Sequence, residues 1–171
     1  DTHPPVCWVH GNHDMKTEDQ YDYLFGSRHP SLHGVVRQVG GIRMAGLGGV
    51  FREDVWYPKE GVQKWDSIEH FLENMGGKNN GWRGGLPRGK RDSIWPDEYQ
   101  QLAQQRADVL VIHEAPECHQ HGHRALGDLA RAMGAGLVVH GHLGCTYQEQ
   151  IQGEIEVLGL GDRESKVIDF P

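Results

Sequence analysis

Three short apolar runs in this chain are each followed by a residue that can bind a metal ion or transfer a proton. Such runs, rich in β-branched residues, predict buried strands. The runs and the residues that follow them are 6–9 with Asn12, 108–112 with His113, and 136–139 with His140 and His142. Ligands collect at the carboxyl ends of strands in open α/β sheets. We therefore expect these side chains to meet at one edge of a sheet, although they are far apart in the sequence.

The first of these sites is the tetrad Gly11-Asn12-His13-Asp14. The amide oxygen of Asn12 is a neutral hard ligand, so a divalent cation bound there still attracts an anionic phosphate. His13 carries an imidazole, a group suited to general acid chemistry, and it can protonate a departing alkoxide. Asp14 can hold the imidazole or the loop in place. The competing interpretation is an ordinary turn, because Gly, Asn and Asp all favour turns. The two further histidine sites favour the metal interpretation.

Taken together, GNHD, a strand ending in His before Pro, and a strand ending in Gly-His make the chain resemble the calcineurin-like metallophosphoesterase superfamily. The resemblance implies an α/β fold, a two-sheet β-sandwich flanked by helices. It also implies two divalent metals and a bridging hydroxide that attacks phosphorus. On this basis Asn12 and His113 match metal ligands, and His13, with Asp14 beside it, matches the leaving-group acid. His142 matches the next ligand, and His140 replaces it if the alignment is shifted.

Two motifs of the family pattern are missing before the tetrad: an Asp-x-His strand end and a Gly-Asp-x-x-Asp strand end. Asp1-Thr2-His3 matches the first in letters only, because no strand precedes it. We therefore expect a single domain over 1–171 that is incomplete at its N-terminus, as in a truncated gene product. Without a bridging carboxylate, two dications repel each other, so one weakly held metal or none is expected here. Amide and imidazole ligands suit manganese, iron or zinc.

The composition is that of one acidic domain, with a formal net charge of −7. This balance speaks against broad nucleic-acid binding. No run approaches the 18 or more apolar residues of a membrane span, so no membrane partner is expected. Cys7, Cys118 and Cys145 are an odd number at unrelated spacings. They predict free thiols and a reducing compartment, which favours the cytoplasm.

The elements between the motifs alternate between strands and helices. Gly40-Gly41 predicts a tight hairpin because both positions tolerate positive φ. The predicted strands are 35–39, 42–45, 145–151, 155–160 and 166–170, and the predicted helices are 65–75, 96–106 and 125–133. Residues 52–95 are expected to form an insertion or lid near the substrate. Its basic stretch, 78–91 with Trp82, is either a lid that meets an anionic substrate or a solvated surface loop.

The histidine-rich stretch 118–123 allows two interpretations. Cys118, His119, His121 and His123 can form a transition-metal clip, but their spacing is not that of a standard zinc module. A loop that shapes the substrate pocket is the favoured interpretation. For the whole chain we expect a metal-dependent phosphoesterase that acts on a phosphate monoester or diester. The alternative is a catalytically impaired fragment that binds a metal or a partner, and a nuclease is a weaker third possibility.

Overall fold

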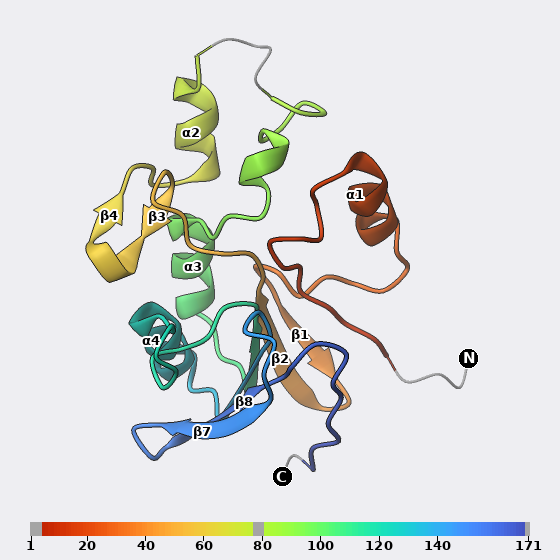
Figure 1. Ribbon diagram of the computed structural model, residues 1–171, viewed down its shortest axis with the longest axis vertical. Helices are drawn as coiled ribbons and strands as arrows, with labels where there is room; N and C mark the ends of the chain where they lie inside the picture. Colours follow the sequence, from red (N-terminus) through yellow and green to blue (C-terminus); the bar gives the residue numbers. More distant parts are fainter. Residues whose placement is uncertain (1–4, 77–80, 170–171) are drawn as a thin grey trace.

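The computed structural model describes residues 5–76 and 81–169 as an α/β fold (Figure 1). Its main sheet has six strands, of which the four in the middle run parallel and the two at the edges run antiparallel to their neighbours. In spatial order the strands are β1 (Val36–Val39), β2 (Ile42–Leu47), β5 (Val109–Ile112), β6 (Leu137–His140), β8 (Ile155–Gly159) and β7 (Tyr147–Ile151). The expected fold class is confirmed.

The hairpin between β1 and β2 forms as predicted from Gly40-Gly41. These glycines adopt φ angles of 58° and 89°, which side chains larger than hydrogen disfavour. The resulting register pairs Val39 with Ile42 and Val36 with Ala45. The hairpin thereby places the carboxyl end of β2 next to that of β5, where Leu47 pairs with Ile112.

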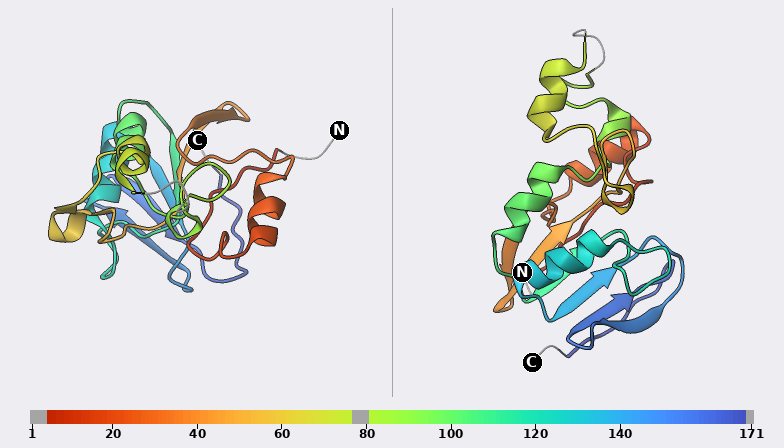
Figure 2. Two further views of the ribbon diagram at one scale, coloured as in Figure 1. Left: turned by 90° about the horizontal axis from the view of Figure 1, so that it is seen from above. Right: turned by 90° about the vertical axis from the view of Figure 1, so that its left-hand side faces the viewer.

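The helices α3 (Pro96–Ala103) and α4 (Arg124–Met133) pack together on one side of the sheet (Figure 2). The apolar face of α4 is fully buried and supplies Leu126, Leu129, Ala130 and Met133 to the main core. This helix ends at Gly134, whose φ of 70° is the left-handed geometry that glycine favours after a helix. Helix α3 was predicted from Pro96 and the acidic residues in its first turn, and it ends three residues earlier than expected. Helix α4 was predicted from its apolar periodicity, and it begins one residue earlier than expected.

Segment 52–95 carries the smaller elements. It contains a two-stranded ribbon, a helix and two short 3-10 turns: β3 (Trp56–Tyr57), η1 (Pro58–Glu60), β4 (Val62–Gln63), α2 (Ile68–Asn74) and η2 (Arg88–Lys90). The segment has its own apolar cluster of Val55, Phe71, Leu86 and Trp95. In the described part of the chain, the ribbon is the second sheet. Positions 78–80 of the predicted basic stretch lie outside the described residues, and the role of the segment as a lid stays a prediction.

Three local elements differ from the sequence-based expectation. Residues 6–9 form no strand, because Trp8 meets only Ser31 in a single bridge. Residues 166–169 are extended outside the sheet, and Val167 is 93% exposed there. Phe170, the end of that predicted strand, lies outside the described residues. Helix α1 (Glu18–Phe25) was not expected, although Thr17 and Gln20 form a capping box at its start.

No helix among the described residues is long and apolar enough to cross a membrane. The three cysteines are free, as their spacing predicts.

Candidate metal centre

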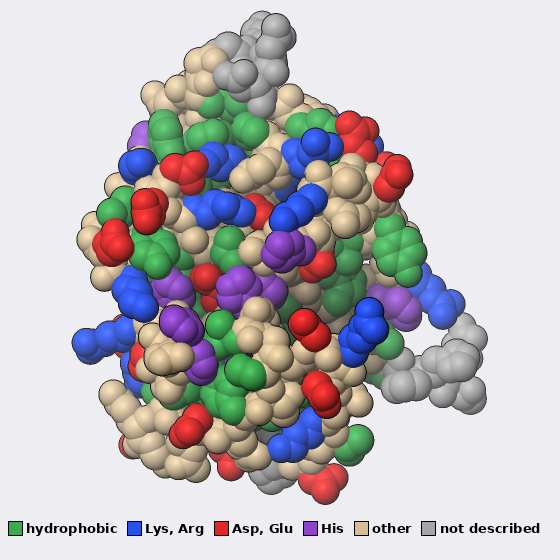
Figure 3. Space-filling model, in the orientation of Figure 1, with side chains coloured by type: hydrophobic (Ala, Val, Ile, Leu, Met, Phe, Trp, Pro, Cys, Tyr) green, Lys and Arg blue, Asp and Glu red, His purple; other side chains and the backbone are tan. Residues whose placement is uncertain are grey.

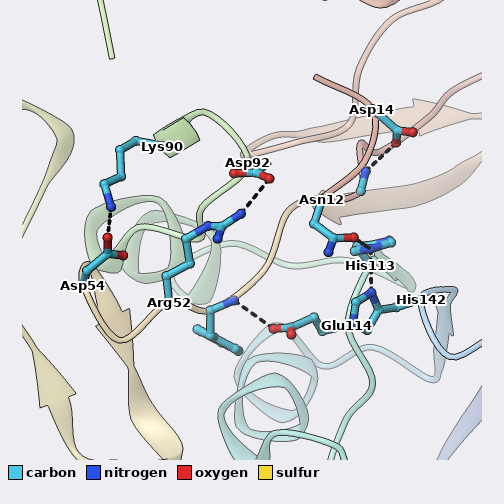
Figure 4. A network of polar contacts seen from close by, with 11 residues as sticks. Asn12, Asp14, Arg52, Asp54, Lys90, Asp92, His113, Glu114 and His142 are labelled. Atoms are coloured by element: carbon cyan, nitrogen blue, oxygen red, sulfur yellow. Dashed lines mark hydrogen bonds and ion pairs between the residues drawn. The ribbon is translucent and has the colours of Figure 1, made fainter. Parts of the chain in front are cut away.

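Asn12, His113 and His142 meet at the carboxyl edge of the main sheet (Figure 4). The Nε2 atom of His113 lies 3.1 Å from Oδ1 of Asn12 and 2.9 Å from Nδ1 of His142. His113 directly follows β5 and His142 follows β6, and these two strands are parallel neighbours. Asn12 arrives on a separate loop, 101 positions before His113. The structure thus brings together three of the predicted ligand residues from distant parts of the chain.

The loop that presents Asn12 is fixed by close packing and hydrogen bonds. The carbonyl oxygen of His10 accepts a hydrogen bond from the Gly49 N–H at 2.8 Å, which ties the loop to the end of β2. The Asp14 carboxylate accepts one from the Gly11 N–H at 2.6 Å. A Cβ atom on Gly11 would lie 2.5 Å from Cε1 of His113, so only glycine allows this approach. Of the two roles predicted for Asp14, the structure shows the contact that holds the loop.

The three polar atoms form a neutral set of donors for a cation. Burial lowers the pKa of His113 to about 4, and the neighbouring His142 contributes to this lowering, so the imidazole is uncharged at neutral pH. His142 has a φ of 70°, a strained conformation of the kind that is often found at functional sites. One amide oxygen and two imidazole nitrogens suit manganese, iron or zinc. These residues therefore fit one divalent cation.

The described residues contain no group of three or more His, Cys, Asp and Glu side chains that is placed to hold a metal ion. The set above falls outside that definition because one of its three members is an amide. Asn12, His113 and His142 are thus the candidate donors that the geometry brings together.

His140, the alternative ligand, makes its hydrogen bonds outside this set. It is 2% exposed, and both of its ring nitrogens are engaged. Nδ1 lies 2.8 Å from the Gly141 carbonyl oxygen, which can only accept, so Nδ1 carries the proton. Nε2 then accepts a hydrogen bond from the Tyr147 hydroxyl at 2.6 Å. In this arrangement His140 positions the strand end, and its role as a ligand stays a prediction.

The side chains of the histidine-rich stretch 118–123 do not converge on one point. The rings of His119 and His121 are 5.6 Å apart, and Nδ1 of His119 accepts a hydrogen bond from the His121 N–H. His123 is buried against Phe51, and its Nε2 lies 3.6 Å from the Glu114 carboxylate. Within the described ranges, Cys118 and these histidines form no metal clip.

Comparison with known proteins identifies the family to which this chain belongs. The sequence pattern of the calcineurin-like phosphoesterases matches residues 2–145 of this chain. The chain belongs to the calcineurin-like phosphoesterase family. This membership suggests a metal-dependent phosphoesterase, because members of this family typically bind divalent metals and act on phosphate esters.

Two individual proteins are similar to this chain. An uncharacterised protein of Haemophilus influenzae is 43% identical over 142 residues, which cover 82% of this chain and 62% of that protein. The crystal structure of TT1561 of Thermus thermophilus matches with a TM-score of 0.54 at 14% identity, over 92% of this chain and 63% of that one. At that identity the likeness shows the fold alone. The chain therefore spans about three fifths of the length of the relatives that it matches.

Beside the candidate centre of this calcineurin-like chain lies a pocket of about 530 Å³ that includes Asn12 in its wall. Its polar lining also comes from Lys16, Arg52, Arg88 and Asp92. Of these, the basic stretch 78–91 includes only Arg88, and the predicted insertion 52–95 also includes Arg52 and Asp92. Arg52 follows the glycine-rich segment 46–51, beyond the carboxyl end of β2. Lys16 is close to the tetrad in the sequence.

Proposed function

We propose that this chain is the part of a metal-dependent phosphoesterase in which Asn12, His113 and His142 hold a divalent cation. The observation that carries the proposal is the position of His113 at the sheet edge, where its Nε2 atom lies 3.1 Å from Oδ1 of Asn12 and 2.9 Å from Nδ1 of His142. When bound, the cation supplies Lewis-acid polarisation of the phosphoryl oxygen and lowers the pKa of water. Manganese, iron and zinc are all compatible with the donor set.

In this proposal His13 donates a proton to the leaving alkoxide oxygen. Its side chain is exposed, and it is near enough to His113 to affect the pKa of that imidazole. His13 is therefore accessible to an ester bound at Asn12 without being part of the donor set. Asp14 acts through the backbone, because its hydrogen bond to Gly11 holds the loop that carries both Asn12 and His13.

A second candidate function is metal binding without turnover. It is favoured by the lack, among residues 5–76 and 81–169, of a carboxylate-containing group that could hold a metal pair. The two candidates share the same centre and differ in whether the ester is cleaved. The free cysteines support a proposed cytoplasmic location for either one.

The test is hydrolysis of 4-nitrophenyl phosphate and bis(4-nitrophenyl) phosphate by the manganese-loaded protein. For an alkyl ester such as glycerol 3-phosphate, we expect His13→Ala to lower kcat by roughly 10²- to 10⁴-fold, the usual contribution of a general acid. The loss should be much smaller for the 4-nitrophenyl esters, because 4-nitrophenolate leaves without a proton, while manganese affinity stays within about twofold. His121→Ala, which changes an exposed histidine outside the centre, is the matched control. Manganese binding without any turnover would favour the second candidate, and turnover of the alkyl ester that His13→Ala leaves unchanged would refute the assigned acid.

A further inference from the structure

The pocket beside Asn12 extends away from the candidate metal centre toward segment 52–95. In Figure 4 the imidazoles of His113 and His142 lie on one side of Asn12, and Arg52 and Asp92 lie on the other. Its volume of about 530 Å³ is within the usual range for small-molecule sites and exceeds what one phosphate group fills. A substrate whose ester lies at Asn12 thus has room to place a further group in this pocket.

The charges of the lining are mostly positive in an otherwise acidic protein. Lys16, Arg52 and Arg88 are cationic and Asp92 is anionic, which leaves two excess positive charges in a chain of net charge −7. Figure 3 shows Lys and Arg side chains next to the histidines on the face seen in Figure 1. Such a local reversal of sign attracts anions into the pocket.

Two of these cations, Lys16 and Arg88, have no ion pair with another described residue. In η2 and the residue after it, Lys90 pairs with Asp54, and Arg91 donates hydrogen bonds to Tyr21 and to the Trp82 carbonyl oxygen. By contrast, the side chains of Arg88 and Lys16 make no hydrogen bond or ion pair with any other described residue. Both are exposed and can reach a ligand without breaking an existing contact.

Arg52 is held in place in the wall of the pocket. Its Nη2 donates to Oδ2 of Asp92 at 2.7 Å, and Asp92 is only 8% exposed. This is the one side-chain hydrogen bond of Arg52 within the described ranges, so most of its N–H groups are available. A fixed guanidinium loses little conformational entropy when it binds an oxyanion.

The residues that line the pocket favour an anionic group of a ligand over an aromatic ring. None of the described residues that line the pocket is aromatic. Trp82, the aromatic of the basic stretch, is instead covered by Arg83 and Arg91, whose guanidinium carbons lie 4.4 and 4.8 Å from its ring centre.

We propose that this pocket binds a second anionic group of the substrate, so that the favoured substrates are phosphate esters that carry a further phosphate. The inference rests on the proposed function, which places the cleaved ester at Asn12. Lys16 and Arg88 determine the preference for such substrates by pairing with the second phosphate. Arg52 offers the third cation from a fixed position.

The test compares fructose 1,6-bisphosphate with fructose 6-phosphate as probes. Calorimetric titration of the metal-free protein in about 150 mM salt should give a dissociation constant at least about tenfold lower for the bisphosphate, since hydrogen bonds to charged groups are strong. In the double variant Lys16→Gln/Arg88→Gln this preference should fall to less than about twofold. The double variant Lys59→Gln/Lys64→Gln removes the same charge from exposed sites outside the pocket and should keep the preference.

Equal affinities for the two probes, or a preference that survives Lys16→Gln/Arg88→Gln, would overturn the inference. A preference that Lys59→Gln/Lys64→Gln also abolishes would overturn it too, because net charge alone would then explain it. Turnover with the metal-loaded protein separates the two proposals. Selective binding of the bisphosphate without cleavage of either ester means that the proposed function fails and the anion site stands. Cleavage of both esters at equal kcat/KM, with equal affinities, means that the proposed function stands and the anion site fails.

Discussion

The two ends of the parallel strands β2, β5 and β6 differ in how their polar groups are used. At the amino ends, Asp108 accepts hydrogen bonds from the backbone N–H of Arg43 at 2.8 Å and from its guanidinium at 2.5 Å. The Gly136 N–H donates to the Asp108 carbonyl oxygen at 3.0 Å, so the first residues of the strands are tied together. At the carboxyl ends, His113 faces another imidazole and an amide oxygen, and Lys16 and Arg88 have no described partner.

This difference separates stability from function along the same strands. At the amino ends, the Arg43 guanidinium and the Asp108 carboxylate satisfy each other. The polar groups at the carboxyl ends include the buried ring of His10, 2% exposed, whose two nitrogens have no hydrogen-bond partner in the described part of the chain. A buried imidazole without a partner costs stability, and this one lies close enough to His113 to interact with it electrostatically.

The largest expected effect comes from removing the central imidazole at the carboxyl end. We expect His113→Ala to weaken manganese binding by at least about 10- to 100-fold, because the loss of even an outer-shell partner of a metal ligand has effects of that size. Calorimetric titration measures it. The double variant His119→Ala/His121→Ala, which removes two histidines that do not converge, should change the affinity by less than about twofold. Equal losses in both variants would contradict the distinction between the two histidine groups.

A smaller effect is expected from adding one methyl group by a Gly→Ala substitution, tested once near the carboxyl ends of the strands and once near their amino ends. In Gly11→Ala the new Cβ meets the His113 ring at 2.5 Å, so the imidazole or the loop must move. Overpacking of this kind costs about 1–3 kcal/mol of stability, and manganese affinity should fall with it. In Gly136→Ala, just before β6, the new Cβ meets no atom within 4 Å. Chemical denaturation and metal titration should show a loss for the first variant only.

The smallest expected effect is on the stability of the protein at acidic pH, and it comes from the amino ends of the strands. The hydrogen bonds from Arg43 lower the pKa of Asp108 to about 2 from its ordinary 3.8. A carboxylate with a lowered pKa in the folded state stabilises it above pH 3.8, and this contribution is lost as the pH falls toward about 2. Asp108→Asn should therefore flatten the pH dependence of the melting temperature in that window and leave manganese affinity unchanged at neutral pH. An exposed carboxylate, Asp162, gives the control variant Asp162→Asn, which should keep the slope.

The sequence predicts the meeting of the strand ends because short β-branched runs indicate buried strands, and parallel strands share an edge. The residues 108–112 and 136–139 conform to this rule, since β5 and β6 are neighbours in the sheet. Trp8 shows where the rule fails. Its apolar run has a similar composition, but a strand also needs a partner, and only Ser31 is in place to form a bridge. Pairing is a property of the fold that the run itself does not contain.

The basic pocket was only partly predictable for a related reason. A run of cations indicates that a surface is positive, but it does not tell which members are already paired. Of Arg88, Lys90 and Arg91, the structure alone shows that Arg88 is available. Likewise the sequence favours His142 and keeps His140 as the alternative ligand, and the contact of His140 with Tyr147 becomes visible only when β7 lies beside β8.

The central claim is that two imidazoles and one amide from three parts of the chain bind the same cation. Pulsed electron paramagnetic resonance of the manganese-loaded protein tests it directly, because coupling to nitrogen counts the coordinated imidazoles. We predict two coordinated imidazoles in the protein and one in either His113→Ala or His142→Ala. A spectrum without imidazole coupling, or one that neither substitution changes, would contradict the account.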